Sequence, residues 1–244
     1  MPCERPKPSS SEVTRLSAAL SRVEIASDFA PGSIQPGQYL LARLHAGWDP
    51  YLRERWQPVR FADRLMIVDR HTEAGDQPGQ VVSLLGPCGK PIPIRRDAQH
   101  LLLIAQDAVP SALVALALKA VEEGRSVTLV LGGAAQAYPL DALPPEVEVL
   151  HADRDWKWPA QVDAFTWAEQ VVALAPPETD FYARLWQTLN QLRIYVPERF
   201  AFGLFLPPTP CGVGACQACL VRGKRKDYLA CTEGPALDLD KLAL

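Results

Sequence analysis

The chain has 244 residues, of which 25 are Lys or Arg and 28 are Asp or Glu, giving a formal net charge of −3. That balance argues against a nucleic-acid clamp, which carries a strong basic excess, so we expect no nucleic-acid partner. Hydrophobic residues make up 48% and charged residues 22%, which excludes disorder for most of the chain and is typical of a globular protein.

The most apolar stretch, residues 101–121, is interrupted by Gln106, Asp107, Pro110 and Ser111. Neither half is long enough to cross a bilayer, so we expect no membrane segment. The first residues, MPCERPKPSSSE, contain no apolar secretion signal. We therefore expect a cytoplasmic protein, in which free thiols stay reduced.

The first part of the chain, from about residue 11 to residue 94, shows a β-rich pattern. Short apolar runs alternate with Gly and Pro turn signals at 37–41, 65–68 and 81–85. Short strands punctuated in this way favour a small antiparallel barrel.

The middle of the chain shows strands alternating with helices. Continuous apolar runs without alternation are typical of strands buried on both faces. The predicted strands are 101–105, 127–131, 147–150 and 171–174, and the predicted helices are 110–123 and 181–195, the second with Leu185, Leu189 and Leu192 on one face. This alternation implies a parallel α/β sheet. One more strand is possible at 202–206, and Pro207-Pro208 ends it.

Four of the six cysteines crowd into the tail, whereas Cys3 and Cys88 stand alone. Cys211, Cys216, Cys219 and Cys231 follow the spacing Cys-x4-Cys-x2-Cys-x11-Cys. We expect the first three on one tight loop and the fourth returning from a hairpin with its tip at 222–227. The tail is too short to build its own core, so it needs a staple of this kind.

The start of this pattern is that of plant-type 2Fe-2S ferredoxins. Gly212 and Gly214 suit a loop that wraps the irons and points backbone N–H groups at sulfur, because glycine adopts the required dihedral angles without strain. A structural zinc more often shows two separated Cys-x2-Cys pairs, and disulfides need an oxidising compartment. The residues thus favour an iron–sulfur cluster, with zinc as the alternative.

The stretch CGVGACQACLV with its nearby fourth cysteine resembles the C-terminal module of dihydroorotate dehydrogenase electron-transfer subunits, within the ferredoxin–NADP reductase-like superfamily. The resemblance implies three segments: a flavin-binding-like barrel (9–96), an NAD-binding-like α/β domain (97–198) and a 2Fe-2S module (199–244). It implies a 2Fe-2S cluster on the four tail cysteines. FAD is a further cofactor, which the other motifs leave open.

The flavin motif of this family, Arg-Pro-x-Ser, corresponds to residues 57–60, Gln-Pro-Val-Arg. The arginine that meets the flavin pyrophosphate is absent, with Arg53, Arg55 and Arg60 as the nearby substitutes. The family's phosphate-holding Gly-Thr helix has no room in residues 71–78. Its Gly-Pro-Leu-Gly motif is recognisable as 86–89. Pro58, Val59, Gly86 and Gly89 would contact FAD mainly through their backbone.

The nucleotide motif of the family is a glycine-rich loop after the first α/β strand. Here residues 105–110 contain no glycine, and Asp107 would repel a phosphate. The family's Cys-Gly-Pro near the nicotinamide appears as Ala175-Pro176-Pro177. The pyridine-nucleotide site is therefore expected to be eroded.

Three functions follow from these patterns. The first is an electron-transfer subunit that relays electrons between a flavin and a partner flavoprotein dehydrogenase, which oxidises dihydroorotate in pyrimidine biosynthesis. The second is a degenerate, non-redox assembly subunit with a structural metal, and the third is a redox module of a different oxidoreductase complex. In the first, the chain acts within a hetero-oligomer and contributes no catalytic side chain of its own.

Overall fold

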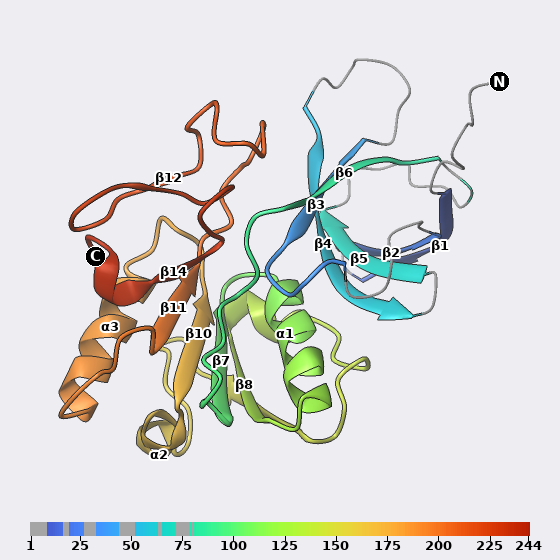
Figure 1. Ribbon diagram of the computed structural model, residues 1–244. Helices are drawn as coiled ribbons and strands as arrows, with labels where there is room; N and C mark the ends of the chain where they lie inside the picture. The colour runs from blue at the N-terminus through green and yellow to red at the C-terminus, as the bar shows by residue number, and fades with distance from the viewer. Residues whose placement is uncertain are drawn as a thin grey trace.

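The computed structural model describes residues 9–16, 20–26, 33–43, 52–62, 65–71, 79 and 81–244. The described residues form two six-stranded sheets and one short two-stranded hairpin (Figure 1). No helix in these ranges is long and apolar enough to cross a membrane. The predicted shortness of residues 71–78 cannot be followed, because 72–78 lie outside the described residues.

The first sheet is antiparallel throughout and has the order β1-β2-β5-β4-β3-β6. Its strands are β1 (Ser9–Arg15), β2 (Leu20–Ala26), β3 (Tyr39–Arg43), β4 (Glu54–Ala62), β5 (Leu65–His71) and β6 (Ser83–Cys88). Val23, Ile25, Leu40, Trp56 and Met66 are buried in its interior. This barrel-like sheet confirms the prediction, although β1, β2 and β4 were not foreseen individually.

The second sheet is mostly parallel and has the order β14-β11-β10-β7-β8-β9. Its parallel strands are β7 (His100–Gln106), β8 (Ser126–Gly132), β9 (Val147–Ala152), β10 (Gln170–Leu174) and β11 (Ala201–Leu204). The edge strand β14 (Ala236–Asp238) runs antiparallel to β11. The tail therefore donates a strand to the α/β sheet.

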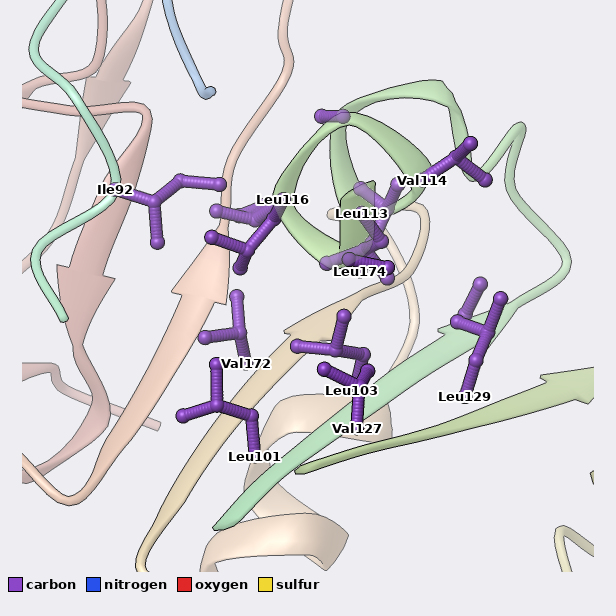
Figure 2. Close-up of a cluster of buried hydrophobic side chains, with 14 of the residues drawn as sticks. Ile92, Leu101, Leu103, Leu113, Val114, Leu116, Val127, Leu129, Val172 and Leu174 are labelled. Atoms are coloured by element: carbon purple, nitrogen blue, oxygen red, sulfur yellow. The ribbon is translucent and has the colours of Figure 1, made fainter. Parts of the chain in front are cut away.

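Helices cover both faces of this sheet. Helix α1 (Ser111–Glu122) covers one face, and α2 (Gln161–Trp167) and α3 (Phe181–Leu192) cover the other. Side chains alternate along β7, so Leu101 and Leu103 face α1, as Figure 2 shows, while Leu102 and Ile104 face α2 and α3. Because both faces of β7 are buried, its sequence is apolar at consecutive positions rather than at alternate ones.

The second predicted helix is shorter than expected. It was predicted at 181–195, but α3 ends at Leu192. Leu185 and Leu189 are fully buried, as predicted, whereas Leu192 is 38% exposed because it lies in the last turn, beyond the edge of the core. Helix α2 was not predicted; its one buried residue, Phe165, gives too little periodicity to detect.

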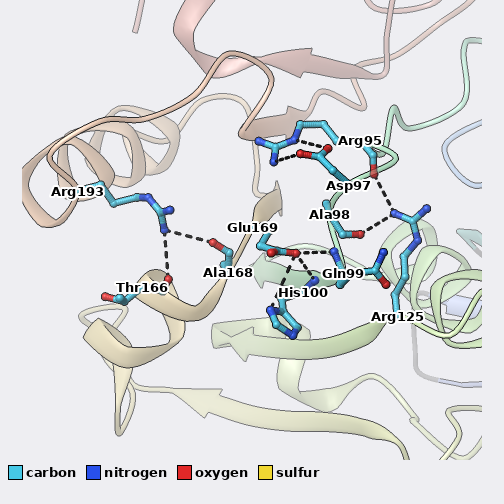
Figure 3. Close-up of polar contacts among 10 residues, drawn as sticks. All are labelled: Arg95, Asp97, Ala98, Gln99, His100, Arg125, Thr166, Ala168, Glu169 and Arg193. Atoms are coloured by element: carbon cyan, nitrogen blue, oxygen red, sulfur yellow. Dashed lines mark hydrogen bonds and ion pairs between the residues drawn. The ribbon is translucent and has the colours of Figure 1, made fainter.

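Charged side chains hold together the edge of the sheet at which β7 and β10 begin (Figure 3). The Glu169 carboxylate accepts hydrogen bonds from the backbone N–H groups of Gln99, at 2.5 Å, and His100, at 3.1 Å. These bonds lower the pKa of Glu169. On the other side, the Arg125 guanidinium donates to the carbonyls of Arg95 and Ala98. Unpaired backbone groups at the start of the sheet are satisfied in this way.

Helix α1 also joins the two halves of the molecule. It lies between the parallel sheet and the barrel, where it packs against β4 (Figure 1). The short 3-10 helix η1 (Gly133–Ala137) follows β8, and the hairpin β12 (Leu220–Val221) and β13 (Tyr228–Leu229) precedes β14. A second 3-10 helix, η2 (Leu239–Lys241), ends the chain. The predicted hairpin in the tail is thus confirmed.

Candidate metal centre and adjoining clefts

The loop between β11 and β12 carries Cys211, Cys216 and Cys219, and Cys231 follows β13. Gly212 has φ +64° and Gly214 has φ +79°, a region that L side chains rarely adopt. A Cβ atom on Gly212 would lie 2.7 Å from Leu41 Cδ1 of the barrel. Glycine is needed at position 212 because of both the backbone angle and the limited space. The requirement for the angle was predicted from the sequence.

The first two cysteines form an outer pair. Hydrogen bonding from the backbone N–H groups of Cys216 and Val213, and from the Cys216 side chain, lowers the pKa of Cys211 to about 6, because it stabilises the thiolate. Cys216 itself is exposed. The loop thus aims its N–H groups at a sulfur ligand in the thiolate form.

The other two cysteines form an inner pair. Cys219 and Cys231 are each 1% exposed, and the Cys231 backbone N–H donates to Cys219 Sγ at 3.4 Å. Burial raises the pKa of Cys231 to about 11. Both residues pack in the apolar cluster that contains Ala230, Leu237 and other residues between the sheet, α2 and α3. A metal bound here would fix the tail to the α/β core.

The four cysteines form two pairs rather than a single group around one metal position. Among the described residues, no group of three or more His, Cys, Asp or Glu side chains converges on one metal position. A tetrahedral zinc needs four ligands around one centre, whereas a 2Fe-2S cluster spreads four thiolates over two irons. The ligand assignment itself stays a prediction.

Pro58 and Val59 are buried in β4, where the register of the β4–β5 pairing shifts. They line a cavity of about 300 Å³ against α1, together with the exposed Arg60. Gln57, which replaces the family's arginine, donates from its amide to the carbonyl of Gln38 at 3.0 Å. Position 57 therefore supplies an amide, rather than a guanidinium, next to Pro58.

Gly86 and Gly89 lie at the end of β6 and just beyond it, separated from β4 by β3. Gly86 has φ +148°, and a Cβ atom there would lie 2.7 Å from Leu40 Cδ2. The Gly89 carbonyl accepts a hydrogen bond from Gln38 Nε2 at 3.1 Å. The four predicted flavin contacts thus lie on two different parts of the barrel, and their role stays a prediction.

A second cleft, of about 290 Å³, lies between the barrel, the start of α1 and the segment before the cysteine loop. Its polar lining includes Arg55, Gln57 and Ser111, and its apolar lining includes Ala112 and Leu206. Arg55 Nη2 and Gln57 Oε1 are buried there without a hydrogen-bond partner among the described residues. A buried donor and acceptor of this kind suit a flat polar ring.

This cleft could hold the ring system of a flavin, but its volume is below the usual range of about 300–1,000 Å³ for small-ligand sites. The residues present therefore fit the ring better than a complete dinucleotide. Arg55 is one of the three candidate substitutes for the motif arginine, but no sequence pattern indicates the cleft, because its lining comes from segments far apart in the chain.

Pyridine nucleotides bind such sheets at the carboxyl ends of the parallel strands. In this chain, carboxylate side chains occupy that region. Asp107, just after β7, has φ +51° and accepts hydrogen bonds from Ala134 N at 3.0 Å and Gln106 Nε2 at 2.8 Å. Its carboxylate lies where a side chain on Gly133 would project. A dinucleotide phosphate needs free N–H groups at this edge, so it does not fit.

A second carboxylate closes the start of α1. Asp69 of β5 accepts hydrogen bonds from Ser111 Oγ at 2.6 Å and Tyr138 Oη at 2.5 Å. It also forms an ion pair with Arg22 of β2 at 3.0 Å. The helix N-terminus that a pyrophosphate uses in related folds is thus joined to the barrel, which agrees with the predicted erosion of the site.

The comparisons with known proteins support the predicted resemblance. Residues 210–243, which contain the four tail cysteines, match the family described as the iron–sulfur cluster binding domain of dihydroorotate dehydrogenase B. The chain is 28% identical over 234 residues to the electron transfer subunit of dihydroorotate dehydrogenase B (NAD(+)) from Shouchella clausii (strain KSM-K16), covering 86% of this chain and 87% of that protein.

Solved structures show the fold. A chain of the NADH-dependent reduced ferredoxin–NADP oxidoreductase has TM-score 0.72 and 19% identity, covering 98% of this chain and 91% of that one. Phthalate dioxygenase reductase has TM-score 0.61 and 11% identity, covering 90% and 86%. The predicted ferredoxin-reductase-like architecture is confirmed.

Proposed function

We propose that this chain is an electron-transfer subunit that carries a 2Fe-2S cluster on Cys211, Cys216, Cys219 and Cys231. The observation that carries the proposal is the arrangement of these cysteines as an outer and an inner pair on the segment that matches the iron–sulfur domain. Such a cluster supplies one-electron transfer when bound. The chain's own residues hold it, shield its inner side and supply N–H donors to its outer side.

The proposal includes the three segments 9–96, 97–198 and 199–244 as barrel, α/β domain and cluster module. It places a flavin ring in the cleft lined by Arg55 and Gln57, with the backbone of Pro58, Val59, Gly86 and Gly89 as further contacts. The position of the cleft along the chain supports transfer between the two groups, because residues 206–208 line the cleft and Cys211 follows three residues later.

The proposed partner is a flavoprotein dehydrogenase that oxidises dihydroorotate, as the name of the Shouchella clausii relative suggests for that protein. The chain would act within a cytoplasmic hetero-oligomer. Because a pyridine nucleotide does not fit the α/β edge, we propose that electrons enter and leave this chain through the partner and the flavin cleft.

The test is anaerobic purification followed by quantification of iron, acid-labile sulfide, zinc and flavin. We expect equal amounts of iron and sulfide, a visible spectrum bleached by dithionite, and an EPR signal after reduction. The variant Cys216→Ser should lose the cluster. Cys88→Ser is the control, because Cys88 is a thiol outside the predicted ligand set; it is half-buried, whereas Cys216 is exposed.

Zinc without sulfide would instead support a non-redox assembly subunit. Loss of the cluster in Cys88→Ser as well as in Cys216→Ser would contradict the ligand set. Co-purification with a dihydroorotate-oxidising subunit separates the proposed function from a redox module of another complex.

A further inference from the structure

Arg55 is a mostly buried cation without an anionic partner among the described residues. It lies in β4 directly opposite Leu41 of β3, and its guanidinium carbon lies 4.0 Å from the centre of the Tyr39 ring. Its Nη2 atom is buried and makes no hydrogen bond. By contrast, Arg70 nearby in the barrel forms an ion pair with Glu54 at 2.9 Å. A buried charge of this kind is costly unless something compensates it.

The immediate neighbours of Arg55 do not supply the missing charge. Burial raises the pKa of the Tyr39 hydroxyl and of the Cys88 thiol, so both are neutral at neutral pH. Burial also lowers the pKa of Arg55 to about 10, which still leaves it protonated at neutral pH. The Asp69 carboxylate also lines this cleft, but it is already paired with Arg22 and accepts hydrogen bonds from Ser111 and Tyr138. Arg55 therefore keeps a positive charge without an ion-pair partner among the described residues.

The same face of the barrel supports the cysteine loop. Leu41, opposite Arg55, lies against Gly212, and Cys88 Sγ would be 3.4 Å from a Cβ atom on Gly212. The Tyr39 ring, which packs against the Arg55 guanidinium, belongs to the same strand as Leu41. Leu41 thus connects the face that carries Arg55 to Gly212, the neighbour of Cys211 in the cysteine loop.

We propose that Arg55 is a positioning residue that sets the reduction potential of the cluster through its charge; this inference rests on the proposed function. Four thiolates and two sulfides make the cluster net negative, and one-electron reduction adds a further negative charge. A buried cation stabilises the reduced form more than the oxidised form, because attraction grows with the charge and is weakly screened in the interior. Arg55 therefore raises the potential.

The test compares Arg55→Met and Arg55→Gln with Arg55→Lys in the full chain, by redox titration followed by EPR. Removing the charge should lower the reduction potential of the cluster by about 59 mV. For one electron, this shift lowers the ratio of reduced to oxidised cluster at a fixed ambient potential about tenfold. The lysine variant should restore at least half of this shift. Iron and sulfide contents are measured on each sample, because they report cluster occupancy independently of potential.

Lys90→Met is the matched control. Lys90 is also a cation beside the tail, since its backbone N–H donates to the carbonyl of Gly234 at 2.6 Å, but its side chain is exposed. Water and salt screen an exposed charge, so the ratio should change by less than about twofold.

An unchanged potential in Arg55→Met or Arg55→Gln with full iron and sulfide would overturn the inference while leaving the proposed function intact. A wild-type protein without a cluster would overturn the proposed function instead. Loss of flavin with an unchanged cluster potential would show that Arg55 serves the cleft, which also overturns the inference.

Discussion

The hydroxyl of Tyr138 donates a hydrogen bond of 2.5 Å to the Asp69 carboxylate and so joins the α/β domain to the barrel. Arg22 completes the contact, because its guanidinium donates to both Asp69 and Tyr138. The Asp69 side chain is only 1% exposed. This network lies at the start of α1, where related folds place a phosphate, and it fixes how the two halves meet.

Asp69→Asn should destabilise the protein strongly. The substitution removes the charge that pairs with Arg22 and leaves a partly buried cation without its partner, at a cost of about 3–5 kcal/mol. For a chain of this size each kcal/mol lowers Tm by about 2–4 °C. Thermal unfolding followed by circular dichroism measures the shift, and a change below about 2 °C would contradict the role of the network.

Tyr138→Phe should change the pH dependence of stability. Burial and the Asp69 carboxylate raise the pKa of Tyr138 above its ordinary value of 10.0. Its stabilising contribution is therefore complete below pH 10 and is lost as the pH rises further, because the unfolded state ionises first. Below pH 10 the variant should be less stable by about 1–3 kcal/mol.

The difference in Tm between wild type and Tyr138→Phe should narrow above pH 10. The comparison with the variant is essential, since the pKa of the buried Tyr182 is also raised and contributes to alkaline unfolding in both proteins. A difference that is constant across the alkaline range would argue against the buried hydroxyl as its source.

NADH should not bind the chain. The Asp107 carboxylate accepts a hydrogen bond from the Ala134 N–H at the carboxyl end of the sheet, and it would repel a phosphate charge. Titration with NADH to about 1 mM, followed by tryptophan fluorescence with inner-filter correction, should show no saturable signal. An NADH-binding reductase of the same fold serves as the positive control, and saturable binding by this chain would refute the closed edge.

Gly212→Ala and Gly124→Ala should differ sharply. Both glycines have positive φ, +64° and +78°, so both substitutions incur backbone strain of about 1–2 kcal/mol. Only at Gly212 would the new Cβ atom meet a neighbour, Leu41 Cδ1 at 2.7 Å, whereas the space at Gly124 is open. We expect Gly212→Ala alone to lower iron and sulfide content.

The double variant Leu41→Ala/Gly212→Ala tests the cause of that loss. Shortening Leu41 removes the clash, so the double variant should regain part of the cluster content, measured by iron and sulfide per chain. Equal losses in Gly212→Ala and Gly124→Ala would mean that backbone angle, rather than space against the barrel, controls the loop.

Removing single cysteines should separate cluster loss from folding. Cys219→Ser places a hydroxyl at a position 1% exposed, so it should lose the cluster and lower Tm even in metal-free protein. Cys216→Ser is exposed and should lose the cluster while leaving the metal-free Tm close to that of wild type. Chelation of iron from the wild type should lower Tm, because a bound metal stabilises the folded state.

Much of the fold follows from local patterns. The predicted strand 101–105 corresponds to β7 and the predicted helix 110–123 to α1, because burial on both faces and helix-ending residues leave signals within a few positions. The cysteine spacing likewise indicated an iron–sulfur site, since ligands close in sequence must share one loop. Leu192, by contrast, was predicted from periodicity to lie on the buried face of the helix. It is partly exposed, because α3 ends at this residue.

The sequence by itself determined the order of β-rich segment, α/β segment and cysteine-rich tail, and the absence of a glycine-rich nucleotide loop. Only the tertiary structure decided that Asp69 meets Ser111 and Tyr138, that Arg55 shares a cleft with the segment before the cysteine loop, and that the tail adds β14 to the α/β sheet. Local backbone preferences and hydrophobic periodicity act over a few residues, whereas these contacts join positions far apart in the chain. Their partners are selected by how the packed domains meet, which no short pattern records.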